Sequence, residues 1–390
     1  MRILVIGADG YMGWPLSCQL AAQADVKTLV LLDNCITREK VKLVGGNSIT
    51  PILEYEERGT LLKERHPDKD IQVIRDSILS DELVNDLCTQ GFDVVYHLGH
   101  LRTAPYSMSS KAACIETVYN NEIGFLNLIW AIKDSSRDTL LIKLGSFGAY
   151  APTGLEIPEN DINLSTISSG TSDVMVPYPK LAGDFYHITK ANDSLFSRAA
   201  CNNWSMKIID VMQSTVFGCY NNFTEQLGET TRFDYDEIYG TVVNRFLIQG
   251  LLGMKLSVYG DGQHSSGIMV LEDAINVLCK LRGEFLLPGE YRVINNNPKA
   301  YKIIELAEKV KEVLELKGIK TDISTNEYDP RHEKNLSGKY KVTTAESKYF
   351  CDNFQETEIT TEIKRSMHLV MDNLSRVNET VIYPTLDWSV

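Results

Sequence analysis

The chain has 390 residues, of which 43% are hydrophobic, and a formal net charge of -13. This composition suffices for one large or two medium cores, and the negative charge argues against a nucleic-acid or acidic-membrane surface. Eight cysteines without a C-x-x-C pair or other metal spacing, and the lack of both a signal peptide and an apolar run of roughly 18 residues, predict a cytoplasmic protein with reduced thiols, no metal and no membrane segment.

The first segment of the chain predicts a dinucleotide-binding turn. Residues 2–6 form a short β-branched strand, and Gly7, Gly10 and Gly13 follow it before a helix-like segment at 14–24. The first glycine permits a tight turn, the second lets the backbone approach a pyrophosphate, and the third lets the helix pack closely on the strand. The helix N-terminus then faces the phosphate charge. An ordinary strand–turn–helix with accidental glycines is the alternative.

A second apolar strand, 28–32, ends at Asp33. This aspartate lies about 20 residues past the last glycine, where an acidic residue accepts the ribose hydroxyls of NAD. A carboxylate at this place would repel a 2′-phosphate, so we expect NAD as the cofactor in preference to NADP. Asp76, after the third strand, can reach the adenine amine or serve only as a turn residue.

Strand and helix signals then alternate as in a doubly wound parallel sheet. The expected strands are 71–74, 93–98, 139–144 and 205–212, and the expected helices are 81–88, 112–132 and 182–200. We predict an α/β fold of the Rossmann type with a smaller, interleaved α/β substrate domain. The NAD-binding domain is expected to comprise residues 1–215 and 255–284, and the substrate domain 216–254 and 285–390.

The reactive side chains are expected on the later elements of this sheet. Tyr186 and Lys190, in YHITK, lie four residues apart and share one face of a helix. The lysine ammonium stabilises phenolate, so the tyrosine can remove a hydroxyl proton while hydride leaves for nicotinamide. Ser146, near the end of a strand, can share a hydrogen bond with the same hydroxyl. The alternatives are a chance pair on a helix and a simple turn or cap serine.

The segments GADGYMG, GSFGAY and YHITK, in this order, resemble the extended short-chain dehydrogenase/reductase superfamily, which contains the NAD-dependent nucleotide-sugar epimerases and dehydratases. Within it, the chain is most similar to the UDP-sulfoquinovose synthase subfamily. The stretches that carry this similarity span most of residues 1–296 and include LRTAPYSM at 101–108, YNNEIGFLNL at 119–128, PYPKLAGDFYHITKANDS at 177–194 and RFDYDEIYGTVVNRF at 232–246.

The resemblance implies a tightly held NAD that is regenerated in each turnover. Tyr186 with Lys190 and Ser146 would oxidise C4 of a nucleotide-bound hexose such as UDP-glucose, the C5 proton and C6 hydroxyl would leave, and sulfite would add at C6 before hydride returns. Arg102 matches a family arginine near the reacting end of the sugar and could hold sulfite, or it is a surface loop arginine. His187 matches a family candidate for C5 or C6 proton transfer, or it is a packed side chain.

The resemblance also assigns binding residues and an oligomeric state. A homodimer is expected through the helices at 112–132 and 182–200. Substrate contacts are expected from Arg102, Tyr106, Gln213, Arg232, Asn244, Arg245, Gln263 and Arg331. NAD contacts are expected from Gly7, Gly10, Tyr11, Met12, Gly13, Asp33, Asn34, Asp76, Ser77, Leu98, Gly99, Asn121, Tyr186, Lys190 and Gln213.

Departures from the family pattern leave the reaction open. Ser146 replaces a threonine and keeps the hydroxyl, but Ala149 replaces a glutamate and removes one candidate acid/base. Phe147–Gly148 stand where 4,6-dehydratases have an Asp-Glu pair. His100 replaces another glutamate, and Ser265 replaces an arginine expected on the substrate diphosphate.

Two classes of function therefore remain beside the sulfite reaction. Either His100 supplies the lost proton transfer, or the chemistry stops at oxidation and epimerisation, as in a nucleotide-sugar 4-epimerase or dehydratase of natural-product or polysaccharide biosynthesis. A catalytically idle NAD-binding regulator is the alternative of another class, against which the intact Ser146, Tyr186 and Lys190 argue.

Overall fold

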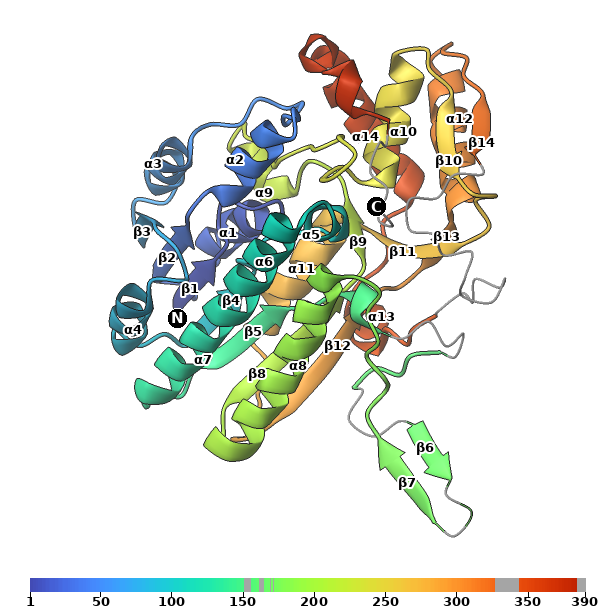
Figure 1. Cartoon of the computed structure of the whole chain (residues 1–390). Coiled ribbons are helices and arrows are strands. Elements are labelled where there is room, and N and C mark those ends of the chain that lie inside the picture. The colour runs from blue at the N-terminus through green and yellow to red at the C-terminus, as the bar shows by residue number, and fades with distance from the viewer. Residues whose placement is uncertain (151–155, 161–164, 169, 171, 327–343, 384–390) are drawn as a thin grey trace.

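A seven-stranded parallel sheet forms the centre of the molecule (Figure 1). The structure is a computed structural model that describes residues 1–390 except 151–155, 161–164, 169, 171, 327–343 and 384–390. All neighbouring strands of this sheet run parallel, which confirms the predicted Rossmann-type α/β fold. From edge to edge the strands are β12 (Tyr291–Asn296), β8 (Lys207–Gln213), β5 (Leu140–Leu144), β4 (Val94–His97), β1 (Arg2–Ile6), β2 (Thr28–Asp33) and β3 (Asp70–Arg75).

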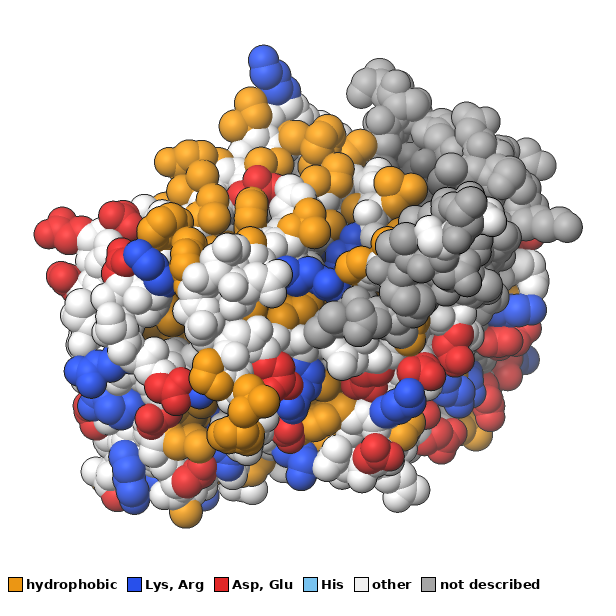
Figure 2. Space-filling view, turned by 90° about the horizontal axis from the view of Figure 1, so that it is seen from below, with side chains coloured by type: hydrophobic (Ala, Val, Ile, Leu, Met, Phe, Trp, Pro, Cys, Tyr) orange, Lys and Arg blue, Asp and Glu red, His pale blue; other side chains and the backbone are white. Residues whose placement is uncertain are grey.

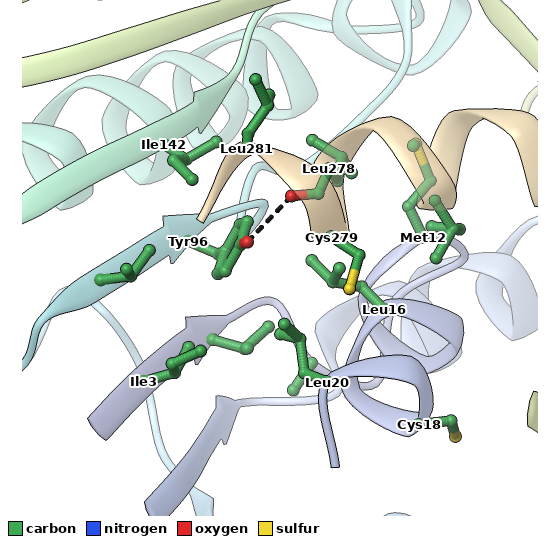
Figure 3. Close-up of a cluster of buried hydrophobic side chains, with 14 of the residues drawn as sticks. Ile3, Met12, Leu16, Cys18, Leu20, Tyr96, Ile142, Leu278, Cys279 and Leu281 are labelled. Carbon is green, nitrogen blue, oxygen red and sulfur yellow. Dashed lines mark hydrogen bonds between the residues drawn. The ribbon is translucent and has the colours of Figure 1, made fainter. Parts of the chain in front are cut away.

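Helices cover both faces of the sheet, which explains why its central strands are almost continuously apolar. α1 (Gly13–Ala21) and α11 (Leu271–Leu281) pack together on one face. Figure 3 shows this core, in which the Tyr96 hydroxyl of β4 donates a hydrogen bond of 2.9 Å to the Leu278 carbonyl oxygen of α11. The other face is covered by α4 (Asp81–Thr89), α7 (Gly124–Asp134) and α8 (Phe185–Trp204).

A smaller helical part lies beside the carboxyl ends of the strands, at the upper right of Figure 1. It has its own apolar core, formed mainly by α10 (Val242–Leu251), α12 (Ile303–Glu315) and α14 (Ile359–Asp372). β10 (Leu256–Tyr259) pairs there with β14 (Ile323–Asn326). A three-stranded sheet of β9 (Thr215–Phe217), β11 (Ser265–Val270) and β13 (Ala300–Lys302) joins this part to the central sheet.

The predicted long helix at 112–132 contains a local irregularity. It consists of α6 (Lys111–Val118), a π-helical turn at Tyr119–Ile123 and α7. In the π-helical turn the backbone hydrogen bonds join residues five apart instead of four. The remaining elements include α2 (Ile36–Leu43), α3 (Tyr55–Arg65), α5 (Ala104–Met108), α9 (Asn222–Gln226), α13 (Lys348–Asn353) and the hairpin of β6 (Ser165–Ser168) and β7 (Asp173–Val176).

The division into two domains stays a prediction. Two strands, however, belong to sheets different from those that the predicted boundaries assign to them. β12, expected with the substrate domain, is the edge strand of the central sheet beside β8. β10, expected with the NAD-binding domain, pairs with β14 in the smaller part. Short apolar strands carry no signal for the sheet that they join, because their partners are distant in sequence. The boundaries at 254 and 285 therefore need to move.

Neither a membrane span nor a metal cluster is found within the described ranges. No helix there is long and apolar enough to cross a bilayer. The same residues contain no group of three or more His, Cys, Asp or Glu side chains arranged to hold a metal ion.

Candidate active site

A cavity of about 1110 Å³ opens where β1, β2, β4, β5 and β8 end. This edge is where open α/β sheets bind ligands. Its opposite wall comes from the smaller part and includes residues between 232 and 245 and between 257 and 268. The cavity therefore has one side at the sheet, where the sequence predicts the cofactor (the cofactor side), and another at the smaller part, where it predicts the substrate (the substrate side).

The glycine turn fits the close packing that a dinucleotide site requires. Gly7 has a φ of +86°, and a Cβ atom there would lie 2.6 Å from the backbone nitrogen of Gly99. A Cβ atom at Gly13 would lie only 1.9 Å from the Gly7 carbonyl oxygen. The turn can thus be built only without side chains at these positions, and it brings the start of α1 to the cavity wall.

Asp33 is fixed at the end of β2 by two backbone groups. Its Oδ2 accepts a hydrogen bond from the Asp9 nitrogen (2.9 Å) and its Oδ1 one from the Cys35 nitrogen (2.6 Å). Burial, followed by the nearby Asp9 carboxylate, raises the pKa of Asp33 to about 6. The side chain lines the cavity beside the glycine turn, as expected for a residue that accepts ribose hydroxyls.

A buried ionic network ties the glycine turn to the substrate side. Asp9 binds Arg38 through both carboxylate oxygens and also accepts a hydrogen bond of 3.0 Å from Arg58. Arg58, which is fully buried, also donates to Glu229 (2.7 Å) and to the Thr230 carbonyl oxygen (2.7 Å). These residues were missing from the sequence predictions, because the network joins segments up to 172 residues apart.

Tyr186 and Lys190 both line the cavity from α8, whose first turn is capped by the Asp184 side chain. The Lys190 ammonium donates to the Leu144 carbonyl oxygen (2.7 Å), lies 2.8 Å from His100 Nδ1, and lies 5.7 Å from the centroid of the Tyr186 ring. Burial raises the pKa of the Tyr186 phenol and lowers the pKa of Lys190 to about 7. Without ligands, the phenol is therefore protonated at neutral pH.

Ser146 and His187 meet Tyr186 in the same cavity. Ser146 follows β5, and its Oγ accepts a weak hydrogen bond of 3.4 Å from the Gly148 nitrogen. His187 Nδ1 lies 2.6 Å from Asp184 Oδ2, and a Cβ atom at Gly148 would lie 2.4 Å from His187 Nε2. The loop after β5 thus lies against the face of α8 that carries the tyrosine.

His100 is placed differently from a residue that would transfer a proton to the sugar. Its side chain is only 3% exposed, and its Nδ1 faces Lys190. Its Nε2 lies 2.7 Å from Asp193 Oδ2. Because both ring nitrogens are engaged inside the protein, His100 can reach a substrate only through Lys190 or by breaking one of these contacts.

The substrate side contains two arginines that share one carboxylate. Arg102 forms an ion pair with Asp234 Oδ2 and donates to the Tyr239 carbonyl oxygen at 3.2 Å. Arg232 binds the other carboxylate oxygen of Asp234 at 2.9 Å. The Asp234 carbonyl oxygen accepts a hydrogen bond of 2.8 Å from Asn244. Two positive charges against one negative charge make this wall suited to an anion.

Further predicted binding residues also reach the cavity. Arg245 donates to the Tyr259 hydroxyl at 2.9 Å and lies over its ring. Gln213 accepts a hydrogen bond of 2.8 Å from the Asn296 amide. The predicted residues on the cavity wall are Gly7, Gly10, Tyr11, Met12, Gly13, Asp33, Asn34, Asp76, Leu98, Gly99, His100, Arg102, Ser146, Tyr186, His187, Lys190, Gln213, Arg232, Asn244 and Arg245.

Four of the predicted residues that the structure describes are not on this wall. Asn121 is buried and bridges the Leu101 backbone and the Thr189 hydroxyl, so it supports the Arg102 loop from behind. Three others contact protein neighbours: Ser77 the Asn34 amide, Tyr106 the Glu116 carboxylate and Gln263 the Lys302 ammonium. Arg331 lies outside the described residues.

The sequence did not lead us to predict Asp184, Asp193 or Asp234, although the position of Asp184 before a helix is a recognisable pattern. Asp184 precedes the helix of YHITK, where an aspartate is a common N-cap, and its Oδ1 accepts from the His187 nitrogen at 2.9 Å. Asp193 and Asp234 carry no comparable signal, because each is recognised only by the distant groups that it contacts.

The sequence pattern of the NAD dependent epimerase/dehydratase family matches residues 3–285. The chain belongs to this family. It is 35% identical over 337 residues to UDP-sulfoquinovose synthase of Sulfolobus acidocaldarius, covering 85% of this chain and 84% of that protein. It is 30% identical over 410 residues to the chloroplastic UDP-sulfoquinovose synthase of Spinacia oleracea, covering 99% and 79%.

Solved structures share the fold of this epimerase/dehydratase. UDP-glucose 4-epimerase of Thermotoga maritima with UDP-glucose superposes with a TM-score of 0.68 at 15% identity, covering 96% of this chain and all of that chain. UDP-glucuronic acid 4-epimerase of Bacillus cereus with UDP-glucuronic acid and NAD gives 0.65 at 18% identity, covering 97% of this chain and all of that chain. The cofactor is NAD, and the protein is an NAD-dependent enzyme that modifies nucleotide sugars.

Proposed function

We propose that this enzyme converts UDP-glucose and sulfite into a UDP-sugar with a sulfonate at C6. The observation that carries the proposal is the single cavity in which Tyr186, Lys190 and Ser146 face an arginine pair, Arg102 and Arg232. The similarity of the chain to two UDP-sulfoquinovose synthases over most of its length also supports this choice. With hydrogensulfite the overall change replaces the C6 hydroxyl by sulfonate and releases water.

The first step is oxidation at C4. Tyr186 takes the proton of the C4 hydroxyl as phenolate, and Ser146 holds the same hydroxyl by a hydrogen bond. The Lys190 ammonium stabilises the phenolate, because a nearby positive charge favours ionisation of a phenol. NAD, which the glycine turn and Asp33 would hold, would supply the hydride acceptor for this step and the hydride donor for the last one. The residues proposed to take part in this oxidation are those of the glycine turn, Asp33, and Tyr186 and Lys190 on α8.

The ketone at C4 acidifies the C5 proton, so a base is needed next. We assign this role to His187, whose Nδ1 is held by Asp184 at 2.6 Å while the ring lies against Gly148 at the cavity wall. Removal of the C5 proton and departure of the C6 hydroxyl as water leave an enone. Sulfite then adds at C6, and C5 regains a proton.

The arginine pair is the proposed sulfite site. Sulfite carries more negative charge than a neutral sugar hydroxyl, and planar guanidinium groups bind oxyanions through two donors. Asp234 binds both guanidinium groups, which fixes their geometry. Arg245 and Asn244, further along the same wall, are proposed to contact the nucleotide.

A 4-epimerase or dehydratase that does not use sulfite is the second candidate. Ala149 and Ser265 favour it, because they stand where the sulfoquinovose synthases have an acid/base glutamate and a diphosphate-binding arginine. In such an enzyme His187 and the arginine pair would serve only to hold the sugar. The buried Lys190 and its contacts with Leu144 and the Tyr186 ring argue against an idle NAD-binding regulator.

Mass spectrometry after incubation with UDP-glucose and sulfite tests the proposal. We expect a UDP-linked product with a C6 sulfonate from the native enzyme and none from Tyr186→Phe. Turnover of UDP-glucose to another UDP-sugar with no sulfonate would establish the epimerase or dehydratase instead. If the native protein converts no UDP-hexose and the Tyr186→Phe variant behaves as the native protein does, the idle NAD-binding regulator would remain as the explanation.

A further inference from the structure

A row of buried polar groups runs from Lys190 through His100 to Asp193. Lys190 Nζ is 2.8 Å from His100 Nδ1, and His100 Nε2 is 2.7 Å from Asp193 Oδ2. All three side chains are almost completely buried. His100 follows β4, whereas Lys190 and Asp193 lie on adjacent turns of α8, so the ring fills the space between the sheet edge and the helix.

The two short contacts favour one arrangement of the protons. The Lys190–Nδ1 contact is a hydrogen bond, whereas Nε2 and Asp193 Oδ2 lie 2.7 Å apart without the alignment of a hydrogen bond, so Asp193 acts on the ring through its charge. An ammonium has only donors and a carboxylate only acceptors. A charged Lys190 therefore donates to Nδ1 of a neutral imidazole, and the Asp193 carboxylate favours the ring proton on Nε2, the nitrogen that lies beside it.

Neighbouring charges support this assignment. Lys143 on β5 and Asp210 on β8 pair with each other at 2.8 Å, and Asp210 also accepts hydrogen bonds from Ser194 and Tyr291. His97 on β4 stacks near His100, with ring centroids 4.4 Å apart, and burial lowers its pKa well below the usual range, so it is neutral. Because Lys143 and Asp210 balance one another, the Lys190 ammonium is left to be balanced by Asp193 through the imidazole.

We propose that His100 and Asp193 are a positioning pair for Lys190: Asp193 selects the Nε2-protonated form of His100, whose Nδ1 then holds the Lys190 ammonium in its charged state beside Tyr186. This inference rests on the proposed role of Tyr186 and Lys190 in C4 oxidation. It gives a function to a histidine at the place where the related synthases have a glutamate. The ammonium uses one hydrogen for Leu144 O and one for His100, which leaves the third for the reacting side.

The proton arrangement can be measured without any substrate. The protein, with its NAD, is labelled with ¹⁵N in the histidine rings, and the His100 signals are identified by their absence in His100→Asn. We expect one protonated nitrogen, Nε2, and an unprotonated Nδ1 at pH 7, and a shift in this balance in Asp193→Asn. A His100 ring protonated on Nδ1, or on both nitrogens, at pH 7 would overturn the proposal.

The kinetic consequence is measured from the pH dependence of NAD reduction by UDP-glucose. His100→Leu removes the acceptor, so the Lys190 proton leaves more easily and the basic limb of the profile should move to lower pH by about one unit. His100→Asn places an amide oxygen near the position of Nδ1 and should keep the limb within about 0.3 units of the native position. A merely space-filling role predicts the same limb for all three proteins and would contradict the inference.

Controls separate this inference from misfolding and from the proposed function. Thermal melting and NAD content identify folded variants, and His66→Asn, at a histidine that does not line the cavity, should give the native profile. If His100→Leu does not fold, Asp193→Asn and the ring-nitrogen spectrum still decide the question. If native protein never reduces its NAD with UDP-glucose, the proposed function fails while the spectrum continues to test the His100 arrangement.

Discussion

Arg102 and Arg232 bind the two oxygens of one carboxylate, Asp234, at the substrate wall of the cavity. Arg102 reaches this point from the loop after β4, whereas Arg232 and Asp234 lie on one segment of the chain. The carboxylate therefore couples the sheet to the opposite wall. Any anion that approaches Arg102 must compete with Asp234 for the guanidinium, which makes the affinity of this site sensitive to both arginines.

Arg102→Ala should impair sulfite use more than sugar oxidation. Loss of charge-assisted hydrogen bonds to an oxyanion is expected to raise the KM for sulfite by about 10- to 100-fold, with NAD reduction by UDP-glucose largely kept. Initial rates over a range of sulfite concentrations measure the first effect, and nicotinamide absorbance in single turnovers measures the second. Arg282→Ala, at an arginine that pairs with Asp25 away from the cavity, serves as the control. Equal losses in both measurements would contradict a sulfite role.

Tyr186→Phe should keep the fold and the bound NAD but lose C4 oxidation by about 10²- to 10⁴-fold, the usual range for a general acid–base group. Ser146→Ala should lose less, because it removes a hydrogen bond and keeps the base. Both are measured as the rate of NAD reduction after mixing with UDP-glucose. Native rates in Tyr186→Phe would remove this residue from the mechanism.

Gly13→Ala should prevent correct formation of the cofactor turn. The added Cβ atom would lie 1.9 Å from the Gly7 carbonyl oxygen, a contact that the backbone can relieve only by moving α1 away from β1. We expect a loss of stability of about 1–3 kcal/mol and a protein without NAD. The matched control is Gly283→Ala, where the nearest atom to the new Cβ lies at 3.6 Å. Thermal melting and NAD content distinguish the two variants.

A homodimer is expected through α6, α7 and α8, which lie side by side. Ile115, Tyr119, Trp130 and Leu195 on this surface are 47–60% exposed, and Figure 2 shows hydrophobic side chains gathered on the upper part of the face seen from below. Such a patch on a folded chain favours association. Leu195→Glu should therefore yield monomers in sedimentation, whereas Leu287→Glu, equally exposed but on the segment before β12, should not. A native protein that sediments only as a monomer would contradict the prediction.

The buried Glu362 on α14 should give the protein a pH-dependent stability. Burial raises the pKa of its carboxyl to about 7, so the folded state binds this proton more tightly than the unfolded state does. The stabilisation is complete at low pH and is lost as pH rises from about 4 to 7, by about 3 kcal/mol. Glu362→Gln stays neutral, so its melting temperature should fall less over this range. Parallel slopes for both proteins would contradict the expected ionisation.

The residues expected to bind the cofactor could be predicted from the sequence, because each is determined by structure within a short stretch of the chain. Gly7, Gly13 and Asp33 are determined by a tight turn, a close helix contact and the end of a strand, each of which leaves a pattern within about 30 residues. His100 was also found, as a departure from a family pattern. Its arrangement was not, because Lys190 is 90 residues away and Asp193 lies behind the ring.

Sheet membership could not be predicted for the same reason. The strands β10 (LSVY) and β12 (YRVINN) are both short, yet one joins β14 and the other β8. Their assignment depends on hydrogen-bond partners that are brought near only by the completed fold.

The Asp9–Arg58–Glu229 network has a consequence for how this enzyme can change. Asp9 belongs to the turn predicted to bind NAD, and Glu229 lies three residues before Arg232 on the wall proposed to bind the sugar. A fully buried guanidinium connects them, so neither end can shift without leaving a charge unpaired inside the protein. New substrates therefore have to be accommodated by side chains that project from this frame, because the frame itself is shared with the cofactor.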